Sequence, residues 1–163
     1  MRSRASIKIG APRIFLGGTV TSELAQILLS FGMNEVEDMA EKRIVVVDDD
    51  ESIRRTFRLL LQKQYRVFLA RDSEEALREF RNLKFDLIIA DLRLPRLSGL
   101  ELVNRFRSLG YRGEAILISA YPDSVSIDEL SRHGIGHFFA KPLDLNVLSR
   151  SIDYMLQPKE ATI

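Results

Sequence analysis

Polar side chains directly follow several short apolar runs in this chain, and their types suit one kind of chemistry. They are Asp48, Asp49, Asp91, Ser119 and Lys141. Carboxylates that lie close together repel one another unless a cation is bound between them. Carboxylate oxygens are hard ligands, which suit Mg²⁺ better than Zn²⁺. We therefore expect Mg²⁺ as the cofactor of this cluster.

The same residues could carry out phosphoryl transfer. That reaction needs a positioned nucleophile, a metal on the phosphoryl oxygens and fixed positive charge around them. Asp91 is the candidate nucleophile, because a carboxylate can form an aspartyl phosphate. Asp48 and Asp49 are the candidate Mg²⁺ ligands. The Lys141 ammonium and the Ser119 hydroxyl could each contact a phosphoryl oxygen.

Taken one at a time, these residues have ordinary explanations. The acidic run at 48–50 could cap the next helix. Asp91 could form a turn before Pro95, Lys141 could be a surface lysine, and Ser119 alone carries no signal. Their shared position at the ends of successive predicted strands favours a joint site.

The elements that would position the site alternate between short apolar strands and amphipathic helices. The predicted strands are Ile44–Val47, Val67–Ala70, Leu87–Ala90, Ala115–Ser119 and His137–Ala140. The predicted helices are Ser52–Gln62, Ser73–Leu83, Gly99–Leu109 and two more that follow Asp123 and Asp144, with Asp72 as a further N-cap. This alternation predicts an α/β fold with five βα units and a parallel sheet. The carboxyl ends of such strands meet at one edge.

The first 42 residues differ from the rest. They begin with glycine and proline, and a predicted helix runs from about Thr21 to Glu41 with a stripe of apolar residues. We expect this helix to pack on its own domain or on a second copy; a recruitment helix or a mis-assigned start codon are the alternatives. The expected organisation is an N-terminal extension at 1–42, one domain at 43–157 and a tail at 158–163.

Composition excludes several classes of function. The 163 residues have a formal net charge of +1, which gives no long-range attraction to nucleic acid or to an anionic membrane. The chain has no cysteine, so disulfides, thiolate metal sites and cysteine nucleophiles are excluded. No apolar run is long enough to span a membrane, and no export signal is evident. We expect a cytoplasmic protein that binds neither nucleic acid nor membrane directly.

Four sequence blocks resemble the landmark blocks of bacterial two-component receiver domains. They are VVVDDDESIR, LIIADLRLPRLSGLEL, ILISAY and HFFAKPLDLNVL, and the resemblance extends from Arg43 to about Gln157. It implies a flavodoxin-like, doubly wound (βα)5 fold with strand order 2-1-3-4-5. It also implies a response regulator whose Asp91 is phosphorylated, with Mg²⁺, by a sensor histidine kinase or a histidine phosphotransfer protein.

The resemblance also assigns roles to residues that their own chemistry does not reveal. The backbone carbonyl of Arg93 would be a further metal ligand beside Asp48, Asp49 and Asp91. Ser119 and Phe138 would be the switch residues, in place of the commoner threonine and tyrosine. Phosphorylation would change the 4-5-5 output face, formed by the last two helices and the last strand.

Two further expectations concern the surroundings of Asp91. Arg93 and Tyr121 are bulky, and we hypothesise that they shield the acyl phosphate from water. The Lys141-Pro142 bond is a candidate cis peptide, since X–Pro bonds adopt that isomer most easily; the sequence leaves the isomer open.

Other functions stay open at this point. A phosphorelay intermediate or a phosphate sink would use the same residues. A Mg²⁺-dependent phosphatase with Asp91 as nucleophile is a second class, although Arg93 stands where a second acid would be needed. A scaffold with an unused site is a third class. We expect no enzyme activity beyond self-phosphorylation from small donors and self-dephosphorylation, with output through a downstream protein target and a possible homodimer.

Overall fold

The structure is a computed structural model that describes residues 41–157. Residues 1–40 and 158–163, and with them the predicted N-terminal helix, lie outside the described part. The elements are β1 (Arg43–Val47), α2 (Glu51–Leu61), β2 (Arg66–Ala70), α3 (Ser73–Phe80), β3 (Leu87–Asp91), α4 (Gly99–Ser108), β4 (Glu114–Ser119), the 3-10 helix η2 (Pro122–Ser124), α5 (Ile127–Arg132), β5 (His137–Ala140) and α6 (Leu145–Leu156). Within the described residues, no helix is both long and apolar enough to cross a membrane.

The five strands form one parallel sheet in the order β2-β1-β3-β4-β5. Both the predicted α/β class and the strand order implied by the resemblance are confirmed. In the sheet register Val47 lies beside Ala90, and Ser119 lies beside Ala140. The carboxyl ends of β1, β3, β4 and β5 therefore meet at one edge, where the predicted site residues follow.

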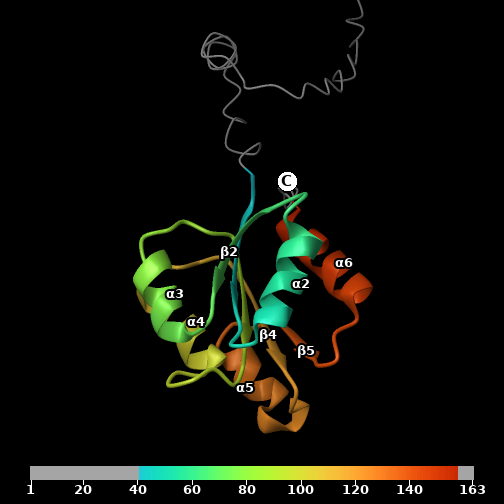
Figure 1. The fold of residues 1–163 in the computed structure, drawn as a ribbon. Helices are drawn as coiled ribbons and strands as arrows, with labels where there is room; N and C mark the ends of the chain where they lie inside the picture. Colours follow the sequence, from blue (N-terminus) through green and yellow to red (C-terminus); the bar gives the residue numbers. More distant parts are fainter. Residues whose placement is uncertain (1–40, 158–163) are drawn as a thin grey trace, which may run out of the picture. The chain divides into compact units, whose positions relative to one another are not determined.

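Helices cover both faces of the sheet (Figure 1). Alternate residues of each strand point to opposite faces, so Val45 and Val47 of β1 pack with α3, α4 and α5, whereas Ile44 and Val46 pack with α2 and α6. A strand buried on both faces needs apolar residues at every position. This explains why β1 and β3 read as continuous apolar runs.

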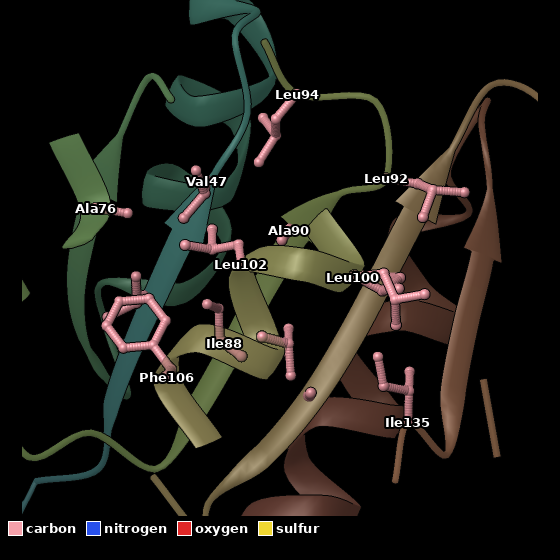
Figure 2. Close-up of a cluster of buried hydrophobic side chains, with 14 of the residues drawn as sticks. Val47, Ala76, Ile88, Ala90, Leu92, Leu94, Leu100, Leu102, Phe106 and Ile135 are labelled. Atoms are coloured by element: carbon pink, nitrogen blue, oxygen red, sulfur yellow. The ribbon is translucent and has the colours of Figure 1, made fainter. Parts of the chain in front are cut away.

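The larger cluster of buried side chains lies between the sheet and α4. Figure 2 shows Leu102 and Phe106 of α4 against Ile88 and Ala90 of β3. Leu102, Ile88 and Ala90 are fully buried, and Phe106 is 1% exposed. Burying a side chain such as Phe106 or Leu102 contributes about 2–3 kcal/mol. This packing fixes α4 against the strand that ends in Asp91.

Polar side chains fix where the helices begin. Asp72 accepts a hydrogen bond from the Glu75 N–H and caps α3, and Asp144 caps α6 in the same way, as predicted. The expectation for Asp123 is wrong, because that residue lies in η2. Helix α5 begins later, and its cap is Ser126, which accepts a 3.1 Å hydrogen bond from the Glu129 N–H. A serine followed three residues later by glutamate is a known sequence signal for a helix start.

Candidate functional site

Three carboxylates gather at the carboxyl edge of the sheet. Asp48 directly follows β1, Asp49 comes next, and Asp91 is the last residue of β3. Each offers an oxygen, and these oxygens all lie within 4.8 Å of one another. Asp48 is fully buried and Asp91 is 6% exposed, whereas Asp49 is exposed. The parallel strands thus bring together three side chains that the sequence analysis assigned to one site.

Asp48 is held by the loop that follows it. Its Oδ1 accepts a hydrogen bond of 2.9 Å from the Asp50 N–H, and its backbone carbonyl accepts one of 2.7 Å from the Arg54 guanidinium. Burial raises the pKa of Asp48 above its ordinary value, although the Lys141 ammonium and the Asp50 N–H act in the opposite direction. Arg54 was not predicted as part of the site, because nothing in the sequence indicates which carbonyl a helical arginine will contact.

The Lys141 ammonium lies between two of the carboxylates. It donates a hydrogen bond of 3.0 Å to Asp48 Oδ2 and another to Asp91 Oδ2. The Lys141 N–H donates to the Ser119 carbonyl at 2.8 Å, and the Lys141-Pro142 peptide bond is cis. Burial lowers the pKa of Lys141, but the hydrogen bonds and charges of the two carboxylates outweigh burial and hold that pKa above its ordinary value. The side chain is therefore a fixed positive charge at neutral pH.

Both carboxylate oxygens of Asp91 have hydrogen-bond partners. Oδ1 accepts from the Arg93 N–H at 2.7 Å, and Oδ2 accepts from Lys141. The Gly99 N–H donates to the Leu92 carbonyl at 3.1 Å. A Cβ atom at Gly99 would lie 2.3 Å from the Asp91 carbonyl oxygen, so this close approach requires glycine. Helix α4 thus begins directly against the backbone of Asp91.

Arg93 follows β3, Ser119 ends β4 and Tyr121 comes two residues later, so all three lie at the carboxyl edge of the sheet. The Ser119 hydroxyl is buried and accepts a hydrogen bond of 2.9 Å from the Tyr121 N–H. The Arg93 guanidinium carbon lies 3.9 Å from the centre of the Tyr121 ring, a cation–π contact. The Tyr121 side chain is 56% exposed, and Arg93 is exposed. Arg93 and Tyr121, which were predicted together to shield the acyl phosphate, form one stacked pair, and the shielding stays a prediction.

Phe138 lies on β5 rather than among the polar groups. It pairs in register with Leu117 and is half-buried against the cluster shared with α3, α4 and α5. Its role as a switch aromatic, and that of the Arg93 carbonyl as a metal ligand, stay predictions.

Among the described residues at the carboxyl edge of the sheet, negative charges outnumber positive ones. Three carboxylates face two cationic groups, the Lys141 ammonium and the Arg54 guanidinium that contacts the Asp48 carbonyl. Oxygen ligands in this number and spacing suit a hard divalent cation. The donor set therefore fits a metal ion such as Mg²⁺.

Comparison with known proteins identifies the family. A family model described as the response regulator receiver domain matches residues 44–153. The chain belongs to this family. Among curated relatives of this receiver domain, the CAI-1 autoinducer sensor kinase/phosphatase CqsS of Vibrio cholerae is 33% identical over 118 residues, and sporulation initiation phosphotransferase F of Bacillus subtilis is 27% identical over 122 residues. The resemblance noted from the four sequence blocks is confirmed.

The matches differ in how much of each relative they cover. The match with CqsS covers 69% of this chain but only 17% of CqsS, so the chain spans a small part of that protein. The match with sporulation initiation phosphotransferase F covers 74% of this chain and 98% of the relative. Among solved structures, the response regulator TrrA of Thermotoga maritima in complex with Mg²⁺-BeF has a TM-score of 0.62 and 32% identity, covering 71% of this chain and 99% of TrrA.

Proposed function

We propose that Asp91 of this receiver domain is the phosphoacceptor and that Asp48 and Asp49 hold Mg²⁺ beside it. The observation that carries this proposal is the position of the Asp91 carboxylate. It is 6% exposed, its Oδ2 is bound by the Lys141 ammonium, and its oxygens lie within 4.8 Å of those of two further carboxylates. Burial raises the pKa of Asp48, so a cation beside this carboxylate would favour its ionised form.

The proposed reaction transfers a phosphoryl group from a phosphohistidine to Asp91. A carboxylate oxygen of Asp91 forms a bond to phosphorus while the P–N bond breaks, and its electron pair stays on the histidine nitrogen. Bound Mg²⁺ would supply positive charge to the phosphoryl oxygens. Lys141 loses one of its two carboxylate partners when Asp91 becomes an acyl phosphate, and its ammonium would then pair with a phosphoryl oxygen.

Ser119 and Phe138 are the proposed switch residues. The Ser119 hydroxyl now bonds to the Tyr121 N–H, and it would turn towards the phosphoryl oxygens. That movement makes room for the half-buried ring of Phe138. The surface formed by α5, β5 and α6 would be the output face. A population shift between two packings of this surface then carries the signal.

The proposed partners are a sensor histidine kinase or a histidine phosphotransfer protein as donor and a downstream protein as target, all in the cytoplasm.

A relay or sink role stays open, because it would use the same residues, and the likeness to a sporulation phosphotransferase supports considering it. Phosphatase activity on free phosphoesters has less support, because the Arg93 guanidinium stacks on Tyr121 and offers no acid to a leaving group.

Beryllofluoride, which mimics a phosphoryl group on aspartate, tests the assignment. ¹⁹F NMR of the full chain with beryllofluoride and Mg²⁺ should show bound fluoride signals that disappear with a chelator or with Asp91→Asn. Asp72→Asn is a matched control, because that residue caps α3 and asparagine also caps helices well. Bound signals that survive Asp91→Asn would overturn the proposal.

A further inference from the structure

Asp49 differs from the other two carboxylates of the site in having no contact of its own. The Asp48 and Asp91 carboxylates each accept one hydrogen bond from Lys141 and another from a backbone N–H. Within residues 41–157, no hydrogen bond or ion pair is found for the exposed Asp49 side chain. The direction of this carboxylate therefore depends on the backbone that carries it.

Arg54 holds the peptide bond that joins Asp48 to Asp49. Its Nη1 donates a hydrogen bond of 2.7 Å to the Asp48 carbonyl oxygen. Because a peptide unit is planar, fixing this carbonyl also fixes the direction of the Asp49 N–H and limits the position of the Asp49 Cα atom. The Arg54 N–H donates to the Asp50 carbonyl at 3.1 Å, so the same residue contacts the acidic loop at both ends.

The surroundings of the Arg54 side chain set it apart from its neighbour on α2. A hydrogen bond from an ionised donor is roughly twice as strong as one between neutral groups. Arg54 is half-buried, and the residue whose carbonyl it contacts, Asp48, is fully buried. Arg55 is exposed, and among the described residues its side chain makes no hydrogen bond or ion pair. The two arginines carry the same charge, but only Arg54 is bound to the loop.

The Arg54 guanidinium can affect a bound cation in two ways that have opposite signs. Its positive charge repels Mg²⁺, so removal of the charge alone would tighten Mg²⁺ binding. Its hydrogen bond positions the Asp49 carboxylate, so removal of the hydrogen bond would weaken Mg²⁺ binding. Groups that orient metal ligands typically contribute a factor of about 10–100 to metal affinity. The sign of the change in affinity therefore shows which of the two effects is larger.

We infer that Arg54 is a positioning residue of the Mg²⁺ site, an inference that rests on the function proposed above. By holding the peptide bond between Asp48 and Asp49, it keeps the Asp49 carboxylate near those of Asp48 and Asp91, whose ligand oxygens all lie within 4.8 Å of one another. The loop then has its metal-binding arrangement before the cation arrives, and Mg²⁺ does not have to order it.

The order of the acidic loop without a cation is the first test. ¹⁵N relaxation of the Asp49 and Asp50 amides is measured in the full, metal-free chain. Arg54→Met removes the donors and the charge, and it should lower the order parameters of both amides towards the values below about 0.6 that mark a flexible backbone. The matched control is Arg55→Met, which removes the same charge and should leave both order parameters at their wild-type values.

Mg²⁺ affinity is the second test, measured from the shifts of the same amides as Mg²⁺ is added. The Kd for Mg²⁺ should rise by about 10-fold or more in Arg54→Met. Arg54→Lys keeps a charged donor and should recover most of the affinity. Arg55→Met should bind Mg²⁺ as tightly as the wild type or slightly more tightly. Should Arg54→Met fail to fold, Arg54→Gln, which keeps only a neutral donor, replaces it in both tests with the same expected direction.

Two results would overturn the role of Arg54. One is an Arg54→Met variant whose loop is as ordered as that of the wild type, and the other is a variant that binds Mg²⁺ as tightly as the wild type or more tightly. Either result would leave the proposed function intact, because the wild type would still bind Mg²⁺. A wild type that binds no Mg²⁺ would contradict both the proposed function and the role of Arg54.

Discussion

Replacing Lys141 by methionine removes the ammonium that lies between Asp48 and Asp91. At an effective dielectric constant of about 20, charges at the 3.0 Å Lys141–Asp48 separation attract each other by roughly 5 kcal/mol before desolvation is subtracted. Removing one partner of a buried pair costs about 3–5 kcal/mol. The Lys141 side chain is 19% exposed, so water can offset part of this loss. We therefore expect the free energy of unfolding to fall by about 2–3 kcal/mol near pH 8 without Mg²⁺.

The loss should depend on pH through Asp48. In the folded protein the pKa of Asp48 is raised above its ordinary value of 3.8. Between pH 3.8 and this raised pKa, the native state therefore binds more protons than the unfolded state. Stability therefore falls as pH rises through that interval. The Lys141 ammonium lowers the pKa of Asp48 in the wild type. Its removal in Lys141→Met therefore raises that pKa and extends the pH interval upward. The destabilisation by Lys141→Met should thus grow as the pH rises above 3.8, the ordinary pKa of an aspartate.

Urea unfolding followed by circular dichroism measures these changes. Lys141→Arg is the control, because it keeps the positive charge and should lose much less stability. Mg²⁺ binding should stabilise Lys141→Met more than the wild type, because the cation takes over the role of the ammonium. A loss below about 0.5 kcal/mol, the range of ordinary surface substitutions, or a loss that is the same at every pH and with or without Mg²⁺, would refute this reasoning.

Four further substitutions test other parts of the structure. Arg96 has a φ of 71°, so Arg96→Gly should raise the free energy of unfolding by about 0.5–1 kcal/mol in the same assay. Gly99→Ala should lower it by about 1–3 kcal/mol, since the added Cβ would lie 2.3 Å from the Asp91 carbonyl oxygen. Arg93→Ala and Tyr121→Ala should each shorten the phosphoryl lifetime, measured by release of inorganic phosphate, because they break the stacked pair beside Asp91; unchanged lifetimes would exclude a shielding role.

Much of the fold could be predicted from the sequence, because the apolar runs of the strands and the amphipathic patterns of the helices are both clear. The inner strands β1, β3 and β4 are buried on both faces, so their residues form nearly continuous apolar runs. The predicted bounds of all five strands agree with the structure to within one residue. The start of α5 was not found, because Asp123 after Pro122 has the chemistry of a cap. The serine at 126 is the cap instead, since only there does a helical turn follow.

The composition of the site was also predictable, but its contacts were not. Parallel strands place Asp48 and Asp91 at one edge, which follows from the alternation of strands and helices. The reach of Arg54 to the Asp48 carbonyl and the stacking of Arg93 on Tyr121 depend on side-chain rotamers in three dimensions. The spacing of residues in the sequence does not predict which rotamers these side chains adopt.

The central claim is that Asp91 accepts a phosphoryl group. Its most direct test is the intact mass of the full chain after incubation with Mg²⁺ and a small-molecule phosphodonor. We expect the wild type to gain the mass of one phosphoryl group, and the gain to be absent in Asp91→Asn and without Mg²⁺. A wild type that gains no phosphoryl group, or a gain that persists in Asp91→Asn, would contradict the account.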